Sequence, residues 1–391
     1  MSARLTFLLA AACGLVVANI YYSQPIAGVI GAELGMDPSQ VGLLVTFTQI
    51  GYSLGLVLVA PLGDILENRR LIAASLAFTI LALLAMVFAP SANAVLAASL
   101  LLGLTGVAAQ IIIPYAAHLT TDAARGRVVG DIMSGLLLGI MLSRPASSFL
   151  THWFGWRAVF ITSAVIMGAL SLTLLRALPQ WRSKSRLNYL GILGSLFSLV
   201  RNTPVLRRRT AYHAPLFAAF SLFWTAAPLL LAGPKFGISQ QGIALFALVG
   251  AGGAIAAPLA GRAADRGATR IMTGAAIAAV VLGMGIAWVG GATGSVALLV
   301  IAAIVLDMGA SANLVLSQRA IFALGNEARS RLNGIFMATF FIGGAIGSAL
   351  STLALAKGGW PLASATGMGF ALLAFLYYLT ELPAFGGPRE S

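Results

Sequence analysis

Long apolar stretches separated by short polar loops run along the whole chain. Stretches without a charged residue recur at lengths sufficient for a membrane helix, which needs about 20 apolar residues to cross the hydrocarbon core. Two further stretches of this length are each interrupted by one charge, Arg144 in the first and Asp307 in the second. The pattern predicts twelve transmembrane helices, over residues 5–32, 38–63, two within 71–121 separated at 90–93, 129–150, 158–175, 210–234, 236–261, 271 to a break at 290–294, 295–319, 332–356 and 358–380.

Composition supports an all-α integral membrane protein. Apolar residues make up 59% of the chain and charged residues 9%, against roughly a quarter charged in soluble proteins. With the N-terminus in the cytoplasm, 20 of the 24 Lys and Arg residues lie on the cytoplasmic side, which is the usual bias of membrane proteins. We therefore read the net charge of +13 as a topology signal, with both termini cytoplasmic, anionic phospholipid as the electrostatic partner and no nucleic acid bound.

Four short sequence marks recur at a nearly constant spacing, which indicates an internal duplication. The repeats are Ser-Gln-Val-Gly at 39–42 with Ser-Gln-Gln-Gly at 239–242, Asp64 with Asp265, Arg-Gly-Arg at 125–127 with Arg-Ser-Arg at 329–331, and Gly-Trp at 155–156 and 359–360. We predict two six-helix bundles, 1–176 and 210–391, joined by a basic cytoplasmic linker, 177–209. The apolar middle of the linker, 187–200, is too short to span a bilayer and is predicted to be an interfacial helix.

At this point the chain resembles the major facilitator superfamily, and most of all its bacterial arabinose-efflux-permease-like and drug-efflux-like group. The resemblance covers all twelve predicted spans and rests on Tyr-Tyr-Ser-Gln-Pro at 21–25, Gln-Ile-Gly-Tyr at 49–52, Pro-Leu-Gly-Asp at 61–64 and Arg-Ser-Arg-Leu-Asn at 329–333. It implies a multi-pass, monomeric transporter of a bacterial inner membrane that alternates access between two bundles. The drug antiporters of this family have Gly before the Pro of span 5, where this chain has Arg144, and the Arg of their span 4 is missing.

Charges in the cytoplasmic loops form a predicted gate. Asp64 is expected near the start of span 11 and Asp265 near span 5, because a carboxylate at the membrane boundary is stabilised by a helix N-terminus and by guanidinium groups. Closing and opening of the inside would make and break these contacts, whereas in the alternative interpretation the charges only mark topology. The predicted gate residues are Asp64, Arg69, Arg70, Arg125, Arg127, Asp265, Arg266, Arg329 and Arg331.

Asp307 is the strongest candidate for coupling transport to protons. It lies about 18 Å into span 10 at a rise of 1.5 Å per residue, and carboxylates at this depth are costly and usually functional. Arg144 lies about 21 Å into span 5, and Pro145 after it is expected to break the helix locally. Two interpretations of Arg144 stay open: it binds substrate or pairs with Asp307, or it extends toward the outer interface as an anchor.

Other polar residues on the predicted spans are candidates for a substrate cavity, since spans 1, 4, 7 and 10 line the centre of the fold by resemblance. Polar groups beside aromatic rings suit a small amphiphilic or polyol substrate, although Asn and Gln also serve as helix–helix hydrogen bonds. The candidates are Asn19, Tyr22, Gln49, Gln110, Arg144, Trp224, Ser311 and Gln318.

The sequence therefore favours a secondary transporter over an enzyme. No nucleotide-binding loop and no cluster of catalytic acids, His or Cys is present, and one Cys with three scattered His predicts neither a metal site nor a cofactor. We expect proton-coupled efflux, by antiport, of a small organic molecule such as a drug-like compound or a sugar. The alternatives are a proton symporter or facilitative importer of a small polar metabolite on the same fold, and a passive channel.

Overall fold

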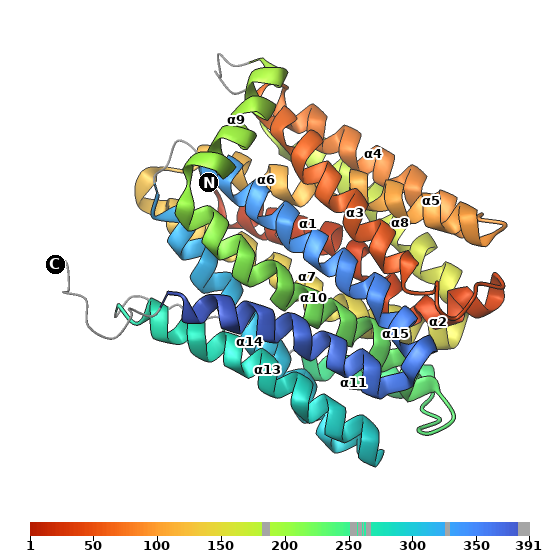
Figure 1. Ribbon diagram of the computed structural model, residues 1–391. Helices are drawn as coiled ribbons and strands as arrows, with labels where there is room; N and C mark the ends of the chain where they lie inside the picture. The colour runs from red at the N-terminus through yellow and green to blue at the C-terminus, as the bar shows by residue number, and fades with distance from the viewer. Residues whose placement is uncertain are drawn as a thin grey trace, which may run out of the picture.

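The structure is a computed structural model that describes residues 1–181, 188–250, 256, 260, 262, 267–324 and 329–381, without the side chains of 122–123 and 329–330. Every regular element in these ranges is a helix (Figure 1). The helices are α1 (Ala3–Tyr21), α2 (Ser23–Glu33), α3 (Leu43–Leu58), the 3-10 helix η1 (Ala60–Asp64), α4 (Asn68–Val87), α5 (Ala92–Thr105), α6 (Ala108–His118), α7 (Asp122–Phe154), α8 (Trp156–Ala177), α9 (Tyr189–Asn202), α10 (Pro204–Ala232), α11 (Gln240–Val249), α13 (Thr269–Thr293), α14 (Val296–Phe322) and α15 (Arg329–Leu379).

Ten helical segments of the described chain are long and apolar enough to cross a membrane. One of the ten lies within α15, whose dihedral angles are non-helical at Gly358 and Gly359, where the last predicted span begins. The shorter helix α11 covers the start of the span predicted at 236–261, and most of the rest of that span lies outside the described residues. These observations are compatible with twelve spans.

The predicted helix breaks have local causes. Ser91 caps α5 by accepting a hydrogen bond from the backbone N–H of Ala94, and Gly294 ends α13 with a φ of 74° that favours glycine. The break predicted at Pro145 is wrong, because α7 continues from Asp122 to Phe154 with this proline inside it. Membrane helices tolerate a proline where neighbouring groups satisfy the freed carbonyl.

Within each half, glycines bring helices into backbone contact. A Cβ at Gly51 of α3 would lie 2.0 Å from the carbonyl oxygen of Leu100 of α5, and a Cβ at Gly347 of α15 would lie 2.0 Å from that of Ala218 of α10. Such small-residue interfaces let membrane helices approach closely. Each half is therefore held together by contacts that leave no room for a side chain.

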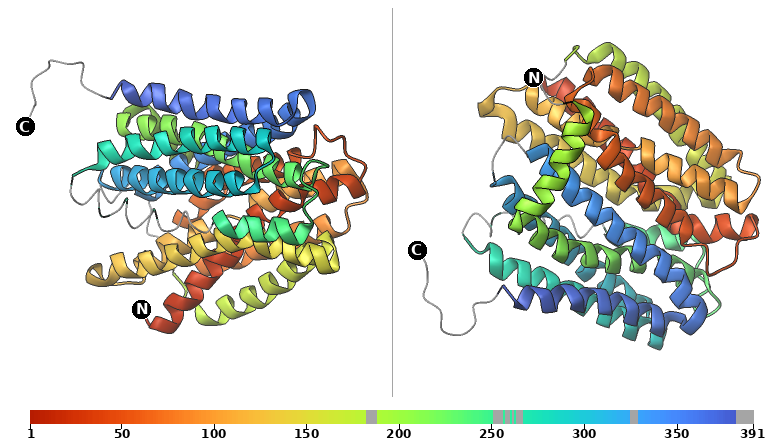
Figure 2. Two further views of the ribbon diagram at one scale, coloured as in Figure 1. Left: turned by 90° about the horizontal axis from the view of Figure 1, so that it is seen from below. Right: turned by 45° about the horizontal axis from the view of Figure 1, so that its top comes forward.

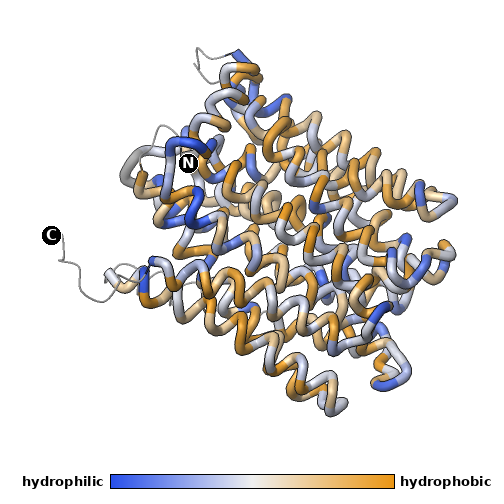
Figure 3. The backbone as a smooth tube through the Cα atoms, in the orientation of Figure 1, coloured by the Kyte–Doolittle hydropathy of each residue, from blue (hydrophilic) through white to orange (hydrophobic). Residues whose placement is uncertain are grey.

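The two halves meet mainly along three helix pairs: α3 packs on α15, α7 on α11, and α2 on α10. Figures 1 and 2 show helices α1–α8 on one side and α10–α15 on the other, with α9 lying across one end. This end also carries the N-terminus and several stretches of hydrophilic residues, shown blue in Figure 3. We name it the basic face, because Arg69, Arg125, Arg319 and Arg331 lie at helix ends there.

The linker helix predicted within 187–200 is present as α9, Tyr189–Asn202. Ile192 and Leu196 are buried against the protein, whereas Leu190 and Phe197 are exposed to 74% and 73%. The Tyr189 hydroxyl donates to the carbonyl of Leu58 in the first half. One face of α9 thus contacts the bundle, and another presents apolar side chains at the basic face.

Candidate functional site

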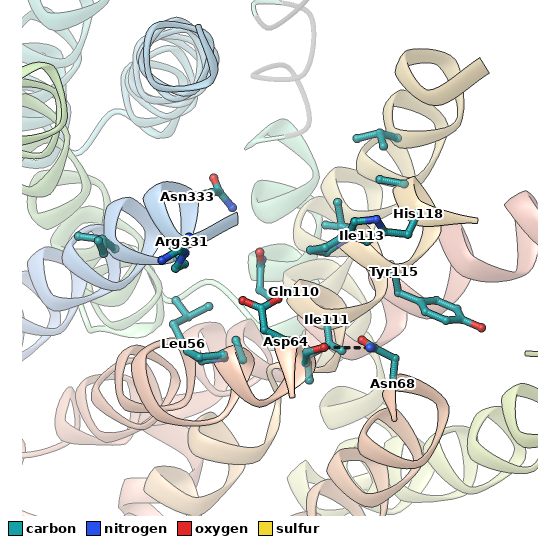
Figure 4. Close-up of a pocket in the computed structure, with 18 of the residues that line it drawn as sticks. Leu56, Asp64, Asn68, Gln110, Ile111, Ile113, Tyr115, His118, Arg331 and Asn333 are labelled. Carbon is teal, nitrogen blue, oxygen red and sulfur yellow. Dashed lines mark hydrogen bonds between the residues drawn. The ribbon is translucent and has the colours of Figure 1, made fainter. Parts of the chain in front are cut away.

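A cavity of about 610 Å³ opens between the two halves at the basic face (Figure 4). Its polar lining comes from both halves, with Asp64, Gln110 and His118 on one side and Arg331 and Asn333 on the other. The predicted gate residues Asp64 and Arg331 therefore face the same space. No ion pair joins these two residues, both of which the structure describes.

Arg331 and three other arginines of the predicted gate bond to groups other than Asp64 in this structure. Arg331 donates to the Ser195 hydroxyl of α9 at 2.8 Å, and Arg125 donates to the Ala117 carbonyl at 3.2 Å. Arg70 pairs with Glu67 at 3.6 Å, and Arg69 donates to the Leu178 carbonyl. Of the other predicted gate residues, Arg127 is exposed. Asp265 and Arg266 lie outside the described residues, as does the side chain of Arg329.

The opposite face is closed by hydrogen bonds between the halves, which we call the outer seal. The hydroxyl groups of Thr46 and Ser348 lie 2.8 Å apart, and the Gly42 N–H donates to the Thr352 hydroxyl at 3.2 Å. A Cβ at Gly42 would lie 2.4 Å from the Ser348 carbonyl oxygen, so this contact is tight. The α3–α15 contact is therefore closed.

A second part of the outer seal joins α11 to the first half. The Gln240 side chain donates to the Ser148 hydroxyl and to the Pro25 carbonyl, both at 3.1 Å. The molecule is thus open at the basic face and closed at the other.

Arg144 lies inside the protein between the halves. Its side chain is 3% exposed, and its Nε donates to the Gln24 side chain at 2.9 Å. The guanidinium carbon lies 4.6 Å from the centroid of the Trp224 ring and within 5.4 Å of the Tyr21 and Phe220 rings, in the range of cation–π attraction. Of the two interpretations left open by the sequence, this position favours a role inside the protein.

Asp307 approaches the same place from the second half. It is 4% exposed and accepts a hydrogen bond of 2.8 Å from the Trp224 indole N–H. Arg144 lies 10 residues before the end of α7, and Asp307 lies 11 residues after the start of α14. At 1.5 Å per residue both are about 15 Å from the outer ends of their helices, near the middle of a bilayer about 30 Å thick.

Arg144 and Asp307 line one small void of about 70 Å³. Ser311 lines it too, one helical turn after Asp307. The remaining lining is apolar apart from backbone groups, and includes Phe220 and Gly250. One cation, one carboxylate and an aromatic wall, contributed by both halves, therefore meet at one depth, and this is the arrangement expected of a binding site in such a fold.

The other predicted cavity residues are divided among several places. Asn19 is fully buried, donates to backbone carbonyls of its own helix, and accepts a 2.6 Å hydrogen bond from Ser163, so it joins α1 to α8. Gln49 donates to the Ser221 hydroxyl across the halves. Gln110 lines the large cavity, and Gln318 donates to Asn333, which also lines it. Tyr22 is partly buried at the junction of α1 and α2.

Sequence analysis missed Gln24, Phe220 and Gly250. Gln24 bridges the halves, because it accepts from Arg144 and donates to Thr225 at 3.4 Å. It lies in the stretch 21–25 that carried the family resemblance, so that motif held a signal. Gly250 offered none, because its role depends on which helix faces it.

The span predicted at 210–234 would place His213 near its start, but the structure buries this histidine more deeply. His213 is 1% exposed, it stacks on Phe336 and Phe340, and its Nδ1 lies 2.6 Å from the Asn313 amide. The helix α10 begins at Pro204, six residues before the predicted span, so this histidine lies deeper than expected.

Two helical halves around a buried polar site, open to one face and sealed from the other, define a membrane transporter. The family model of the Major Facilitator Superfamily matches residues 7–316 and 213–390. The chain belongs to the Major Facilitator Superfamily.

Relatives of this chain agree with that assignment. The putative uncharacterized transporter YgaY of Escherichia coli (strain K12) is 39% identical over 381 residues, which cover 97% of this chain and 95% of YgaY. The probable transporter SCO4007 of Streptomyces coelicolor is 33% identical over 366 residues, 92% of this chain and 83% of that protein. The crystal structure of the nucleoside transporter NupG has a TM-score of 0.74 at 14% identity, covers 98% of this chain and 100% of its own, and shows the shared fold.

Proposed function

We propose that this protein is a proton-coupled secondary transporter of a small organic molecule, with Asp307 as the group that carries the proton. One observation carries the proposal: Arg144 and Asp307, from opposite halves, share a buried void at mid-depth. The free energy of ionising a carboxylate in such a buried position depends strongly on the charged and polar groups around it. Movement of the halves can therefore expose it to one face at a time.

In this proposal the structure is the state of the cycle that is open to the cytoplasm of a bacterial inner membrane. The large cavity lies at the basic face, and basic loops are retained on the cytoplasmic side. The predicted gate contact between Asp64 and Arg331 belongs to the opposite state, in which the cavity has closed. If transport is outward, as predicted, the substrate enters this cavity from the cytoplasm.

A second candidate is proton symport of a polar metabolite, and Arg144 favours it. The Nη2 atom of this buried guanidinium has no hydrogen-bond partner. A fixed buried cation suits a substrate with acceptor groups, whereas a cationic drug would be repelled.

Everted membrane vesicles test both candidates in one measurement. Respiration acidifies the vesicle interior, and a pH-sensitive dye reports the gradient while a chemically varied compound panel is added. Antiport releases protons and weakens the gradient, whereas entry of substrate together with a proton strengthens it. Asp307→Asn is the paired variant, and it should lose either response while still exchanging substrate.

The control corrects for compounds that carry protons through the lipid unaided. Such leakage occurs equally in vesicles with wild type and with Asp307→Asn, so only the difference between them counts. A response of equal size in both preparations would refute Asp307 as the proton carrier.

A further inference from the structure

The free end of Arg144 marks a place for a ligand in the midplane site. Nε is bonded to Gln24, but Nη2 has no partner although the side chain is 3% exposed. A buried donor left unpaired is costly. The void of about 70 Å³ that Arg144 lines is the space in which a partner can lie.

The void extends from the two charges toward the basic face. On α7 it is lined by Met141 and Leu137, which precede Arg144 by about one and two helical turns, respectively, on the side of the cavity. On α14 it is lined by Ser311 and Val315, which follow Asp307 in the same direction. A molecule arriving from the cavity would therefore place its head at Arg144 and an apolar body between these helices.

Among the described residues, three titratable groups lie at the site. Tyr21 of α1, Arg144 of α7 and Asp307 of α14 are the titratable groups there, and α10 contributes the rings of Phe220 and Trp224. The residue that follows α11, Gly250, also lines the site, and the sequence from 240 to 261 contains no ionisable residue. The charge at the site is therefore set by one arginine and one aspartate.

Counting charge in this buried site distinguishes the classes of substrate. With Asp307 ionised the empty site is neutral, and with Asp307 protonated it carries one positive charge. A bound anion restores neutrality only when Asp307 is protonated, whereas a bound cation leaves at least one net positive charge in both forms. Because uncompensated charge at this depth is strongly unfavourable, anion and proton bind together and cations are rejected.

We propose that the substrate is an organic monoanion, a carboxylate with an apolar body, that binds Arg144 and crosses the membrane together with one proton on Asp307. Arg suits this role because its planar guanidinium pairs with a carboxylate through two parallel N–H bonds. The inference rests on the proposed proton coupling and, of the two candidate couplings, selects symport. Export by this route remains feasible wherever the anion is more concentrated inside.

Thiol chemistry at the void tests the charge preference without knowledge of the substrate. Ser311→Cys, made in a chain with Cys13→Ala, reacts with an anionic methanethiosulfonate ethylsulfonate or a cationic trimethylammonium counterpart. The quantity compared is the rate of the anionic reagent divided by that of the cationic reagent, because this ratio does not depend on the reactivity of the thiol itself. Asn333→Cys, in the large cavity, supplies the same ratio away from Arg144, and the ratio at Ser311→Cys should be about tenfold higher.

Companion variants assign the preference to the two charges. Arg144→Gln should lower the anionic-to-cationic rate ratio at Ser311→Cys to that at Asn333→Cys. Arg144→Lys should keep most of the roughly tenfold difference, because it keeps the positive charge. The pair of variants therefore separates loss of the charge from a general loss of folding. In the Ser311→Cys chain with Asp307 and Arg144 intact, the anionic-to-cationic rate ratio should rise as the pH falls from 9 to 5. Protonation of Asp307 then leaves the positive charge of Arg144 without a compensating negative charge. In Asp307→Asn the ratio should be high and independent of pH.

Several results would overturn the inference. Equal ratios at the two thiols, a faster cationic reagent, or no reaction at Ser311→Cys would each remove the anion site. A ratio independent of pH in wild type would remove the link to the proton. Failure of the proposed function shows elsewhere, as an absence of any Asp307-dependent dye response in everted vesicles across the compound panel.

Discussion

Gly250 lies so close to Asp307 that no larger residue fits between their helices. A Cβ at Gly250 would be 2.5 Å from Oδ2 of Asp307 and 2.8 Å from a ring carbon of Trp224. The position of the carboxylate therefore depends on the absence of a side chain at Gly250, directly after α11.

Gly250→Ala should disable coupling without unfolding the protein. The added methyl group displaces Asp307 from the indole N–H, and overpacking of this kind costs about 1–3 kcal/mol. Uphill transport in vesicles should fall by about tenfold or more, whereas thermal stability in detergent should change by only a few degrees. Gly168→Ala is the control, since nothing lies within 4 Å of its added Cβ. Wild-type transport by Gly250→Ala would contradict the close contact.

Trp224→Phe should separate the two roles of this ring. The variant keeps an aromatic face near Arg144 but loses the hydrogen bond to Asp307, and bonds to a charged group contribute about 1.5–3 kcal/mol. Uphill transport should fall by at least about tenfold, and Trp224→Leu, which also removes the ring, should fall further. Initial rates in proteoliposomes check this order. Equal rates in the two variants would show that the ring face contributes nothing.

Thr46→Val should loosen the outer seal. The change keeps the shape of the side chain but removes its hydroxyl bond to Ser348 in the other half, worth about 1 kcal/mol. The population open to the outer face should rise by roughly fivefold, as measured by reagent access to Ser351→Cys, a small change at a buried side chain of the same interface.

The control for this experiment is Thr173→Val. Thr173 is exposed, and its hydroxyl donates only to the Ala169 carbonyl of its own helix. Equal reagent access in both variants would mean that the seal does not depend on this hydroxyl pair.

Asp64→Asn should stabilise the state seen here. Asp64 and Arg331 line the open cavity without an ion pair, so their attraction acts mainly when the cavity closes. The variant should therefore reduce closure, and reagents should reach Asn333→Cys faster than in wild type. Asp131→Asn, at an exposed position nine residues after the start of α7, removes the same charge at a side chain that does not line the cavity. Unchanged access in Asp64→Asn would reduce Asp64 to a marker of topology.

The turn before α3 should be insensitive to pH over the physiological range. The Ser39 hydroxyl and backbone N–H both donate to the Asp37 carboxylate and lower its pKa. A lowered pKa means that the contribution of this contact is complete above the ordinary aspartate value of about 4 and is lost only as the pH falls through the lowered value. Hydrogen exchange of residues 37–42, corrected for the intrinsic rate, should be constant from pH 5 to 8. It should become faster in Asp37→Asn.

The amino-acid sequence was most informative where a property belongs to one segment. Apolar length located the described spans, and the turns near Pro90 and Gly294 follow from local chemistry. The depth of Arg144 and Asp307 also follows from counting residues along a helix. Their shared void was a hypothesis until both helices were placed, because residue spacing does not say which helix faces which.

Gln24, Gly250 and His213 show why the rest could not be predicted. Gln24 acquires its role from Arg144, 120 residues away in the chain, and Gly250 acquires its role by leaving space for Asp307. The depth of His213 depended on where α10 begins, and charged residues at 207–209 hid the extension of that helix. Each case depends on a contact between distant segments or on a helix end that hydropathy does not mark.

The hydroxyl groups along α3 and α15 have a consequence for the speed of the cycle. Parting two polar surfaces in lipid normally strands donors, and this raises the barrier. Here Thr46 also lies within reach of the Gly42 carbonyl, Ser53 of the Gln49 carbonyl and Ser348 of the Ala345 carbonyl, each on its own helix. When the helices part, each of these hydroxyl groups can still donate to a nearby backbone carbonyl on its own side of the interface. The interface can exchange partners without desolvated intermediates, so fast turnover and a watertight closed state are compatible in one contact.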